Sequence, residues 1–441
     1  MPDRLALPLV WALPFAGLLL SIAFVPLVAS RFWHDHFGKV AVAWSLALVV
    51  PFAFVHGLAA TIEPLLHTLL TDYLPFIIVL FALYTIAGGL CVRGAFTGSP
   101  TRNAGILALG ASIASVIGTT GASMLLIRPL ISANEGRRHR AHTMVFFILL
   151  VGNVGGALSP LGDPPLFIGF LRGVDFFWEL ENMLAPTVLL AGAILAIYFI
   201  VDSVLYRNDR PPPPSPQRFA IEGAQNLLLL AAVVGAVLIS GVWHPDFEFT
   251  LLGVHLPLQN VVRDAFLLAL ALASLALTPP AIREHNAFHW APIIEVAKIF
   301  AAIFVTIIPV LTMLAAGRHG ALGFISQFVL DPAGEPLNRA VFWTTGLLSA
   351  FLDNAPTYLV FFNLAGGHAP DLMTTHSATL MAISMGAVYF GALTYIGNAP
   401  NFMIKAVAED RGIAMPSFFG FVARACAVML PLLALIGWLY L

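Results

Sequence analysis

Two short polar segments in an otherwise apolar chain carry residues that could bind a cation or a proton. The segment GALSPLGDPPLF begins at Gly156 and contains Asp163, and the segment GALTYIGNAPNF begins at Gly391 and has Asn398 at the matching place. They lie 391 − 156 = 235 residues apart and agree at Gly, Ala, Leu, Gly, Pro and Phe. Carboxylate, amide, hydroxyl and freed carbonyl oxygens are ligands that suit Na⁺. The sequence therefore predicts the same kind of ion-binding segment twice.

A second pair of polar segments has the same separation. GTTGAS begins at Gly118 and DNAPTY begins at Asp353, and 118 + 235 = 353. We expect two sites, each formed by one of these bends facing the broken segment of its own half. The candidate ligands for a cation or substrate are Thr119, Thr120, Ser123, Asn153, Ser159, Gly162 and Asp163 in the first half, and Asp353, Asn354, Thr357, Thr394, Gly397, Asn398 and Asn401 in the second.

The composition indicates a bilayer around these segments. Only 10% of the 441 residues are charged and the mean hydropathy is +0.90, whereas soluble domains carry roughly 25% charged residues. Backbone polar groups in lipid must pair internally, so the spans are helices or a closed barrel. The long apolar runs lack the alternation of barrel strands. The fold class is an all-α polytopic membrane protein, and a net charge of −2 without a basic run gives no indication of nucleic-acid binding.

The apolar pattern predicts two kinds of membrane segment. Continuous apolar stretches of spanning length occur at 5–29, 39–61, 74–93, 184–206, 220–243, 263–280, 291–315 and 416–441. Apolar stretches interrupted near their middle by Gly, Pro and small polar residues occur at 104–133, 141–171, 339–365 and 376–408. Proline stops a helix from continuing, and Gly162 and Gly397 permit backbone angles that other residues disfavour. We expect each interrupted stretch to be a broken helix or a bend.

A proline-rich stretch divides the chain into halves of similar size. The linker covers 207–219 and contains four consecutive prolines, which favour a stiff extended segment. It separates a first half, 1–206, from a second half, 220–441, and each half contains one copy of the repeated segment.

The basic residues predict how the chain threads through the membrane. Placing the basic loops in the cytoplasm makes 104–133 and 339–365 re-entrant hairpins from opposite sides, while 141–171 and 376–408 cross fully in opposite directions. Two inverted-topology repeats of this kind are typical of secondary transporters. The basic residues used for this thread are Arg31 and Lys39, which we expect to flank one loop, and Arg93, Arg102, Arg137, Arg138, Arg140, Arg207, Arg210, Arg218, Arg283, Lys405 and Arg411.

The bend followed by a broken helix of the form Gly-Gly, Ser/Thr-Pro, Gly-x-Pro-Pro resembles the ion transporter superfamily over nearly the whole chain. That superfamily includes sodium/proton antiporters of the NhaD type, citrate transporters, arsenite permeases and sodium-coupled dicarboxylate symporters. The resemblance implies a scaffold domain and a transport domain with elevator-type movement, in a homodimer in a bacterial inner membrane. The dicarboxylate branch has Ser-Asn-Thr at both bends, but here the bends read Gly118-Thr119-Thr120 and Asp353-Asn354-Ala355. The LGDPP segment, 161–165, is closer to the antiporter and permease branches.

The charge of the two predicted sites indicates the substrate. Each site has one acid, Asp163 or Asp353, and a charge near the bilayer centre costs at least ~2.5–3.5 kcal/mol. A cation or proton must neutralise it, so we interpret the chain as a sodium/proton antiporter that transports Na⁺ and H⁺ and needs no bound cofactor. The alternative is a sodium-coupled symporter for citrate, a dicarboxylate or another anion. The chain lacks a nucleophile–His–acid grouping, HExxH and a phosphate loop, so an enzyme is not expected.

Three further charged residues in apolar segments have more than one interpretation. Glu295 and Lys298 lie three residues apart on one helix face, either as an ion pair that holds helices together or, together with Asp163 and Asp353, as proton carriers. Arg128 is a partner for an anionic substrate, a partner for an acid, or a residue whose charged end reaches the membrane surface.

Overall fold

The structure is a computed structural model that describes residues 7–94, 97–207, 209, 220–286, 288–316, 320–331 and 334–441. Of the predicted linker, 207–219, only residues 207 and 209 are among them, so Arg210 and Arg218 lie outside the described residues.

Seven helices in the described part of the chain are long and apolar enough to cross a membrane, or eight if a pair bent by 41° counts as one span. Each of the eight predicted apolar spans corresponds to one of them, which confirms an all-α polytopic membrane protein. They are η1 (Leu9–Ala12) with α1 (Leu13–Val28), α2 (Ser30–His56), α3 (Leu58–Thr68) with η2 (Leu69–Tyr73) and α4 (Leu74–Ala87), α9 (Trp178–Tyr206), α10 (Gln225–Val242), α11 (Leu258–Leu277), the bent pair α13 (Ala291–Thr306) and α14 (Ile308–Ala315), and α21 (Phe418–Tyr440).

One predicted loop is wrong. Arg31 and Lys39 were expected to flank a loop, but α2 already begins at Ser30, only one residue after α1 ends, so both lie within the helix. The apolar pattern identifies only the part of a helix that hydrocarbon surrounds. Helix α2 continues beyond that part because its first turns carry polar side chains, such as His34 and His36, that are stable at a membrane surface.

The four interrupted stretches break where the sequence predicts. The first bend joins α5 (Pro100–Ile117) to α6 (Thr119–Ala133), and the second joins α16 (Asn338–Leu352) to α17 (Asn354–Leu364). The first broken helix consists of α7 (Ala141–Leu150), η3 (Val154–Gly156) and α8 (Pro164–Leu171). The second consists of α19 (Ser377–Phe390), η5 (Gly391–Leu393) and α20 (Ala399–Asp410).

Short elements complete the described fold. Antiparallel strands β1 (Cys91–Arg93) and β2 (Ala220–Glu222) pair Cys91 with Glu222 and so connect the end of α4 to the start of the second half. A separate hairpin is formed by β3 (Glu248–Leu251) and β4 (Val254–Pro257). The remaining short helices are α12 (Pro280–His285), α15 (Gly323–Val329) and α18 (Ala369–Met373).

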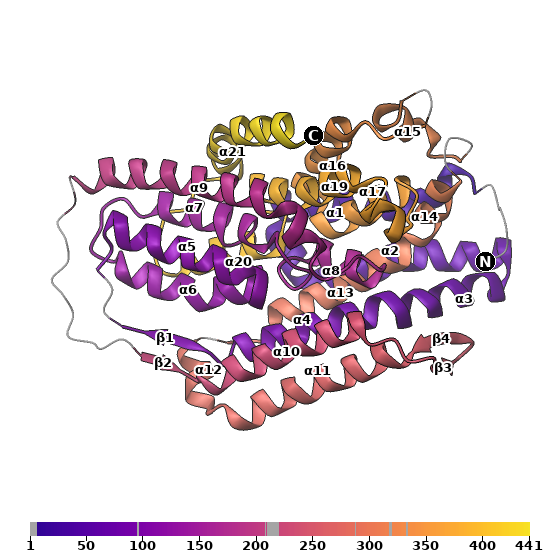
Figure 1. Ribbon diagram of the computed structural model, residues 1–441, viewed down its shortest axis with the longest axis horizontal. Helices are drawn as coiled ribbons and strands as arrows, with labels where there is room; N and C mark the ends of the chain where they lie inside the picture. Colours follow the sequence, from indigo (N-terminus) through magenta and orange to yellow (C-terminus); the bar gives the residue numbers. More distant parts are fainter. Residues whose placement is uncertain are drawn as a thin grey trace.

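The helices pack in two groups (Figure 1). In one group α4, α10 and α11 lie side by side, and α13 packs on α1 and α2. The other group contains both bends and both broken helices, with α5 against α6 and α9, and α16 against α17 and α19. Helix α8, from the first half, packs against α17, from the second. The broken parts of both halves therefore meet inside one group.

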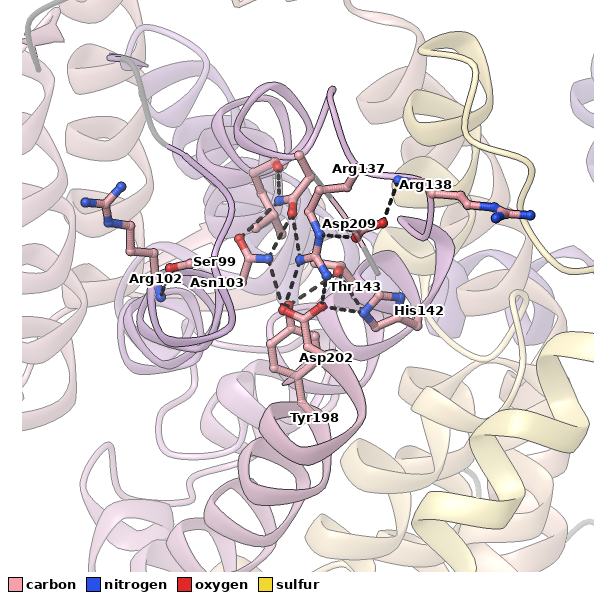
Figure 2. A network of polar contacts seen from close by, with 12 residues as sticks. Ser99, Arg102, Asn103, Arg137, Arg138, His142, Thr143, Tyr198, Asp202 and Asp209 are labelled. Carbon is pink, nitrogen blue, oxygen red and sulfur yellow. Dashed lines mark hydrogen bonds and ion pairs between the residues drawn. The ribbon is translucent and has the colours of Figure 1, made fainter. Parts of the chain in front are cut away.

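A buried ionic network ties one end of this second group together (Figure 2). Arg137, in the loop between α6 and α7, binds Asp202 of α9 with both guanidinium ends, at 2.5 and 3.0 Å, and its Nε donates to Asp209 at 3.0 Å. Asp202 also contacts His142 Nε2 at 2.8 Å and accepts from Asn103 of α5 at 3.3 Å. The side chains of Arg137 and Asp202 are fully buried, and such bidentate pairs are both strong and geometrically specific.

We predict that Asp202→Asn destabilises the fold by about 3 kcal/mol. Removing one partner of a buried ion pair typically costs ~3–5 kcal/mol, and Asp209 still contacts Arg137 in the variant, which places the expected loss at the lower end. The measurement is the thermal unfolding midpoint of the purified protein in detergent. Glu409→Gln is the matched control, because it breaks the partly exposed Lys405–Glu409 pair, and exposed pairs contribute only about 0–1 kcal/mol. Equal midpoints for the two variants would contradict the prediction.

Candidate functional site

The two bends have the same backbone conformation. Gly118, between α5 and α6, has φ 80° and ψ 149°, and Asp353, between α16 and α17, has φ 81° and ψ 144°. A positive φ suits glycine but is strained for a residue with a Cβ atom. At the first bend, the Thr119 N–H donates to the carbonyl of Gly162 at 2.9 Å, which attaches the bend to the broken helix of its own half.

The second parts of the two broken helices also begin alike. Asp163 is the residue before α8, with φ −144° and ψ 143°, and Asn398 is the residue before α20, with φ −155° and ψ 140°. Each carbonyl accepts a bond of 3.1 Å from the N–H three residues later, in Leu166 and Asn401 respectively. The residue before the helix therefore carries a carboxylate in the first half and an amide at the equivalent position in the second half.

The hydroxyl groups of Ser159 and Thr394 attach each broken helix to its bend helix. Ser159 Oγ donates to the Ser115 carbonyl, and Thr394 Oγ1 donates to the Ala350 carbonyl at 2.5 Å. The accepting residues are themselves 350 − 115 = 235 positions apart. In the structure these two predicted ligands contact the backbone rather than Asp163, and so act as anchors.

Asp163 lies at the centre of the site and is bound from both halves. Thr119 Oγ1 donates to its Oδ1 at 3.2 Å, Asn398 Nδ2 donates to Oδ1 at 2.9 Å, and Asn354 Nδ2 donates to Oδ2 at 2.5 Å. The side chain is only 2% exposed. Within the described residues its hydrogen-bond partners are neutral, and no Lys or Arg forms an ion pair with it. Among the residues that the structure describes, the carboxylate thus has hydrogen-bond donors but no ion-pair partner.

Two further predicted residues extend this centre through side-chain amides. Asn398 Nδ2 also contacts Asn153 Oδ1 at 3.2 Å, and Asn153 Nδ2 donates to Asn401 Oδ1 at 2.7 Å. Asn401 in turn donates to the carbonyls of Gly391 and Thr394, at 2.8 Å each. The two predicted sites are therefore joined in one network, whereas the sequence placed each within its own half.

Gly162 and Gly397 are needed for space rather than for a special backbone angle. Neither has a φ in the left-handed region. A Cβ atom on Gly397 would lie 2.7 Å from the Gly391 carbonyl oxygen and 3.0 Å from that of Ala350, and one on Gly162 would meet Gly156. The expectation that these glycines permit unusual turns is corrected: the backbones of the broken segments approach too closely for any side chain.

Asp353 lies at a bend between two helices, whereas Asp163 lies at the start of a helix in the broken segment. Its carboxylate faces the N-terminus of α17, where the Ala355 N–H is 3.5 Å away, and its carbonyl accepts from Thr357 Oγ1 at 2.8 Å. Asp353 is half-buried, and it lies close enough to interact electrostatically with Asp163. Thr357 thus contacts its own helix.

Ser123 is fully buried on α6, and its hydroxyl has no hydrogen-bond partner among the described residues.

A small cavity adjoins Asp163 where the two helix groups meet. Its volume is about 80 Å³, and it is lined by Thr119, Thr120 and Asp163 from one group and by Leu83, Ile293 and Val296 from the other. One water occupies about 30 Å³ of liquid, and pockets for drug-sized ligands measure about 300–1,000 Å³. In this conformation the cavity has room for water-sized groups and is smaller than pockets for drug-sized ligands.

Glu295, Lys298 and Arg128 lie elsewhere. Glu295 lies beside Trp33 of α2, and Lys298 Nζ is 5.5 Å from the ring centre of Phe37. Glu295 and Lys298 therefore both contact α2, and the structure shows no ion pair between them.

Arg128 Nη1 donates to Asn286 Oδ1 at 3.3 Å, at the loop after α12. The structure thus gives Arg128 a neutral partner away from Asp163.

Besides Asp202, the buried acids Asp72 and Glu179 also lie outside the predicted site residues. Asp72, in η2, binds Arg172 at the end of α8 at 3.0 Å and so connects the two helix groups. Glu179, in the first turn of α9, is 0% exposed, and neither carboxyl oxygen has a hydrogen-bond partner among the described residues. Glu179 precedes the predicted apolar stretch 184–206, so hydropathy did not mark it as an acid within a spanning helix. Burying a carboxyl group without a hydrogen-bond partner is costly in its charged form.

We predict that Asp353→Gly leaves the protein at least as stable as the wild type. The substitution relieves a positive φ that costs about 1–3 kcal/mol for an L-residue, and glycine replaces a helix-capping residue at a loss of only a few tenths of a kcal/mol. Asp353→Ala is the control, since it keeps the strain and loses the cap. The measurement is the unfolding midpoint in detergent, and a Gly variant as unstable as the Ala variant would exclude strain at this bend.

We predict that Glu179→Gln lowers the unfolding midpoint far less than Asp202→Asn does. Gln has nearly the same shape as a neutral Glu side chain, and the substitution leaves no buried cation without a partner. Both variants remove one buried carboxyl group from α9, so the comparison is matched. A loss as large as that of Asp202→Asn would show that Glu179 is charged and paired.

Comparisons with known proteins agree with this architecture. A protein family described as "Putative citrate transport" matches residues 4–441. Two uncharacterized transporters, one from Mycobacterium bovis and one from Mycobacterium tuberculosis, are each 23% identical to this chain over 359 residues, which cover 78% of this chain and 78% of each relative. Since the family match covers nearly the whole chain and agrees with the resemblance seen in the sequence, the chain belongs to this citrate-transporter-like family of ion transporters.

Proposed function

We propose that this transporter is a sodium/proton antiporter in which Asp163 binds either Na⁺ or H⁺. The observation that carries the proposal is a buried carboxylate bound by three neutral side chains, with no ion pair to a basic residue in the described structure. A carboxylate in a low-dielectric site favours a cation or a proton over an anion. The cavity of about 80 Å³ beside Asp163 also suits a small ion.

The neighbouring amides can serve both occupants. The Nδ2 atoms of Asn354 and Asn398 donate to Asp163, and rotation of an amide by half a turn presents its Oδ1 as a cation ligand. Asn354 Oδ1 is buried and has no hydrogen-bond partner in the described residues, so it is available for this role. Na⁺ and H⁺ then exclude each other at one carboxylate. The site crosses the low-dielectric region only when either ion neutralises Asp163.

We also propose that the halves are inverted repeats with re-entrant hairpins, and that the group containing them moves against the other group as in an elevator. Two similarities support the repeat. The backbone angles at Gly118 and Asp353 are nearly the same, and the hydroxyl groups of Ser159 and Thr394 bind equivalent backbone carbonyls. Figure 1 agrees with opposite entry, because α5–α6 and α16–α17 extend toward opposite ends of the molecule. The resemblance further suggests a homodimer in the bacterial inner membrane.

The second candidate is a sodium-coupled citrate or dicarboxylate symporter. The family description favours it, because it refers to citrate transport. In this alternative Na⁺ occupies the Asp163 site and the carboxylate substrate binds next to it after the cavity widens. The departure of both bends from Ser-Asn-Thr and the small cavity favour the antiporter.

A reconstituted assay separates the two candidates. Purified protein in proteoliposomes with an imposed pH gradient is exposed to Na⁺, Li⁺, K⁺, citrate or succinate, and internal pH and labelled-substrate uptake are recorded. An antiporter dissipates the gradient on addition of Na⁺ without an organic anion. Sodium-dependent accumulation of citrate or succinate without Na⁺-driven proton movement would establish the symporter instead.

We predict that Asp163→Asn reduces Na⁺-driven proton movement to the level of empty liposomes while the protein stays folded. Asn has almost the same shape as Asp but cannot exchange a proton or supply the negative charge. The control is Asp371→Asn on the exposed end of α18, which should exchange at the wild-type rate. Wild-type exchange by Asp163→Asn, at an unchanged unfolding midpoint, would exclude Asp163 as the shared binding group.

A further inference from the structure

A basic cleft lies away from Asp163, beside the buried ionic network. It measures about 640 Å³ and opens between α7, the last turns of α9 and the start of α21. Its basic lining residues are Arg138, His139, Arg140, His142 and Arg424. The other lining residues are mostly apolar side chains of the three helices, such as Val145, Val201 and Val428. The cleft thus combines cationic groups with hydrocarbon walls.

The positive charge of this cleft is not balanced by its own lining. No acid is among the described residues that line it. The nearby acids Asp202 and Asp209 are bound by Arg137, and Asp209 also accepts from the backbone N–H of Arg138 at 3.1 Å. Two lining residues already have partners, since His142 contacts Asp202 at 2.8 Å and Arg140 donates to the Gly412 carbonyl at 3.3 Å. Figure 2 shows the Arg138 side chain pointing away from this network, toward the yellow C-terminal part of the chain. The network holds the backbone of the loop while leaving the Arg138 guanidinium for another partner.

The cleft lies where a lipid would reach it. Helices α9 and α21 are both long and apolar enough to span a membrane. On the same turns of α9 that line the cleft, Ile200 and Val204 are 62% and 56% exposed, and exposed apolar side chains on a spanning helix face lipid. Arg138 and Arg424 are exposed as well. A phospholipid could therefore place its acyl chain against the apolar walls and its phosphate among the arginines.

We propose that this cleft binds an anionic phospholipid. Arginine forms charge-assisted hydrogen bonds with phosphate oxygens, and basic pockets between membrane helices bind anionic headgroups. A zwitterionic headgroup cancels its phosphate with its own cation, so it gains less from the exposed arginines Arg138 and Arg424. A free phosphate would leave the apolar walls without a partner. The proposal uses no residue of the Asp163 site and does not depend on which substrate is transported.

The test measures which lipid stays with the purified full-length protein. Wild type and variants are reconstituted into nanodiscs that contain equal amounts of phosphatidylglycerol and phosphatidylcholine, extracted gently in detergent, and analysed by native mass spectrometry for retained lipid. We expect wild type to retain phosphatidylglycerol preferentially. Arg138→Gln with Arg424→Gln should reduce this preference about thirtyfold, because each basic residue near an anionic lipid contributes about 1 kcal/mol.

The matched control removes two positive charges elsewhere. Arg31→Gln with Lys39→Gln changes two exposed residues of α2 and should retain phosphatidylglycerol as wild type does. Unfolding midpoints of all variants, measured in the same detergent, verify that the fold is intact. Equal retention of the two lipids by wild type, or equal preference in the cleft variant and the α2 variant, would overturn the proposal. Saturable displacement of phosphatidylglycerol by inorganic phosphate would also overturn it, because a free anion would then be the better ligand.

Discussion

The arrangement of the bends and broken helices centres on one buried carboxylate, Asp163. A carboxylate in such surroundings is costly unless hydrogen bonds, a proton or a cation stabilise it. The structure supplies donors from Thr119, Asn354 and Asn398, which come from three different elements. This arrangement requires both bends and both broken helices to meet at one point. The four interruptions thus bring Thr119, Asn354 and Asn398 within hydrogen-bond distance of Asp163.

The interrupted backbone is held by short, local contacts. Ser159 and Thr394 each bind a carbonyl of the neighbouring bend helix, and the glycines at 162 and 397 let backbones approach more closely than any side chain permits. Away from the centre, the Arg137–Asp202 pair fixes the ends of α6, α7 and α9. Local backbone contacts thus hold the middle of this helix group, and a buried ion pair holds its end.

The sequence alone determined the membrane class, the eight spans and the four breaks. Apolar length, proline and glycine act on the nearest few residues, so their effects can be read from a short stretch of chain. The fixed offset of 235 residues also placed Gly118 opposite Asp353 and Asp163 opposite Asn398, and the structure gives each pair matching backbone angles. Arg31 and Lys39 show where this kind of prediction fails. Hydropathy identifies the part of a helix that lies in hydrocarbon, but it does not identify the residue at which the helix begins or ends.

Only the tertiary structure decided which polar side chains contact each other. Asn354 and Asp163 are 191 residues apart, and no local pattern reveals that α17 packs against α8. For the same reason the sequence placed Ser159 and Thr394 among the ligands, although packing directs them to backbone carbonyls. The sequence also predicted two separate sites, whereas the amides of Asn153, Asn398 and Asn401 join them into one network. A side chain's type is fixed by sequence, but its partner depends on which helices lie beside it.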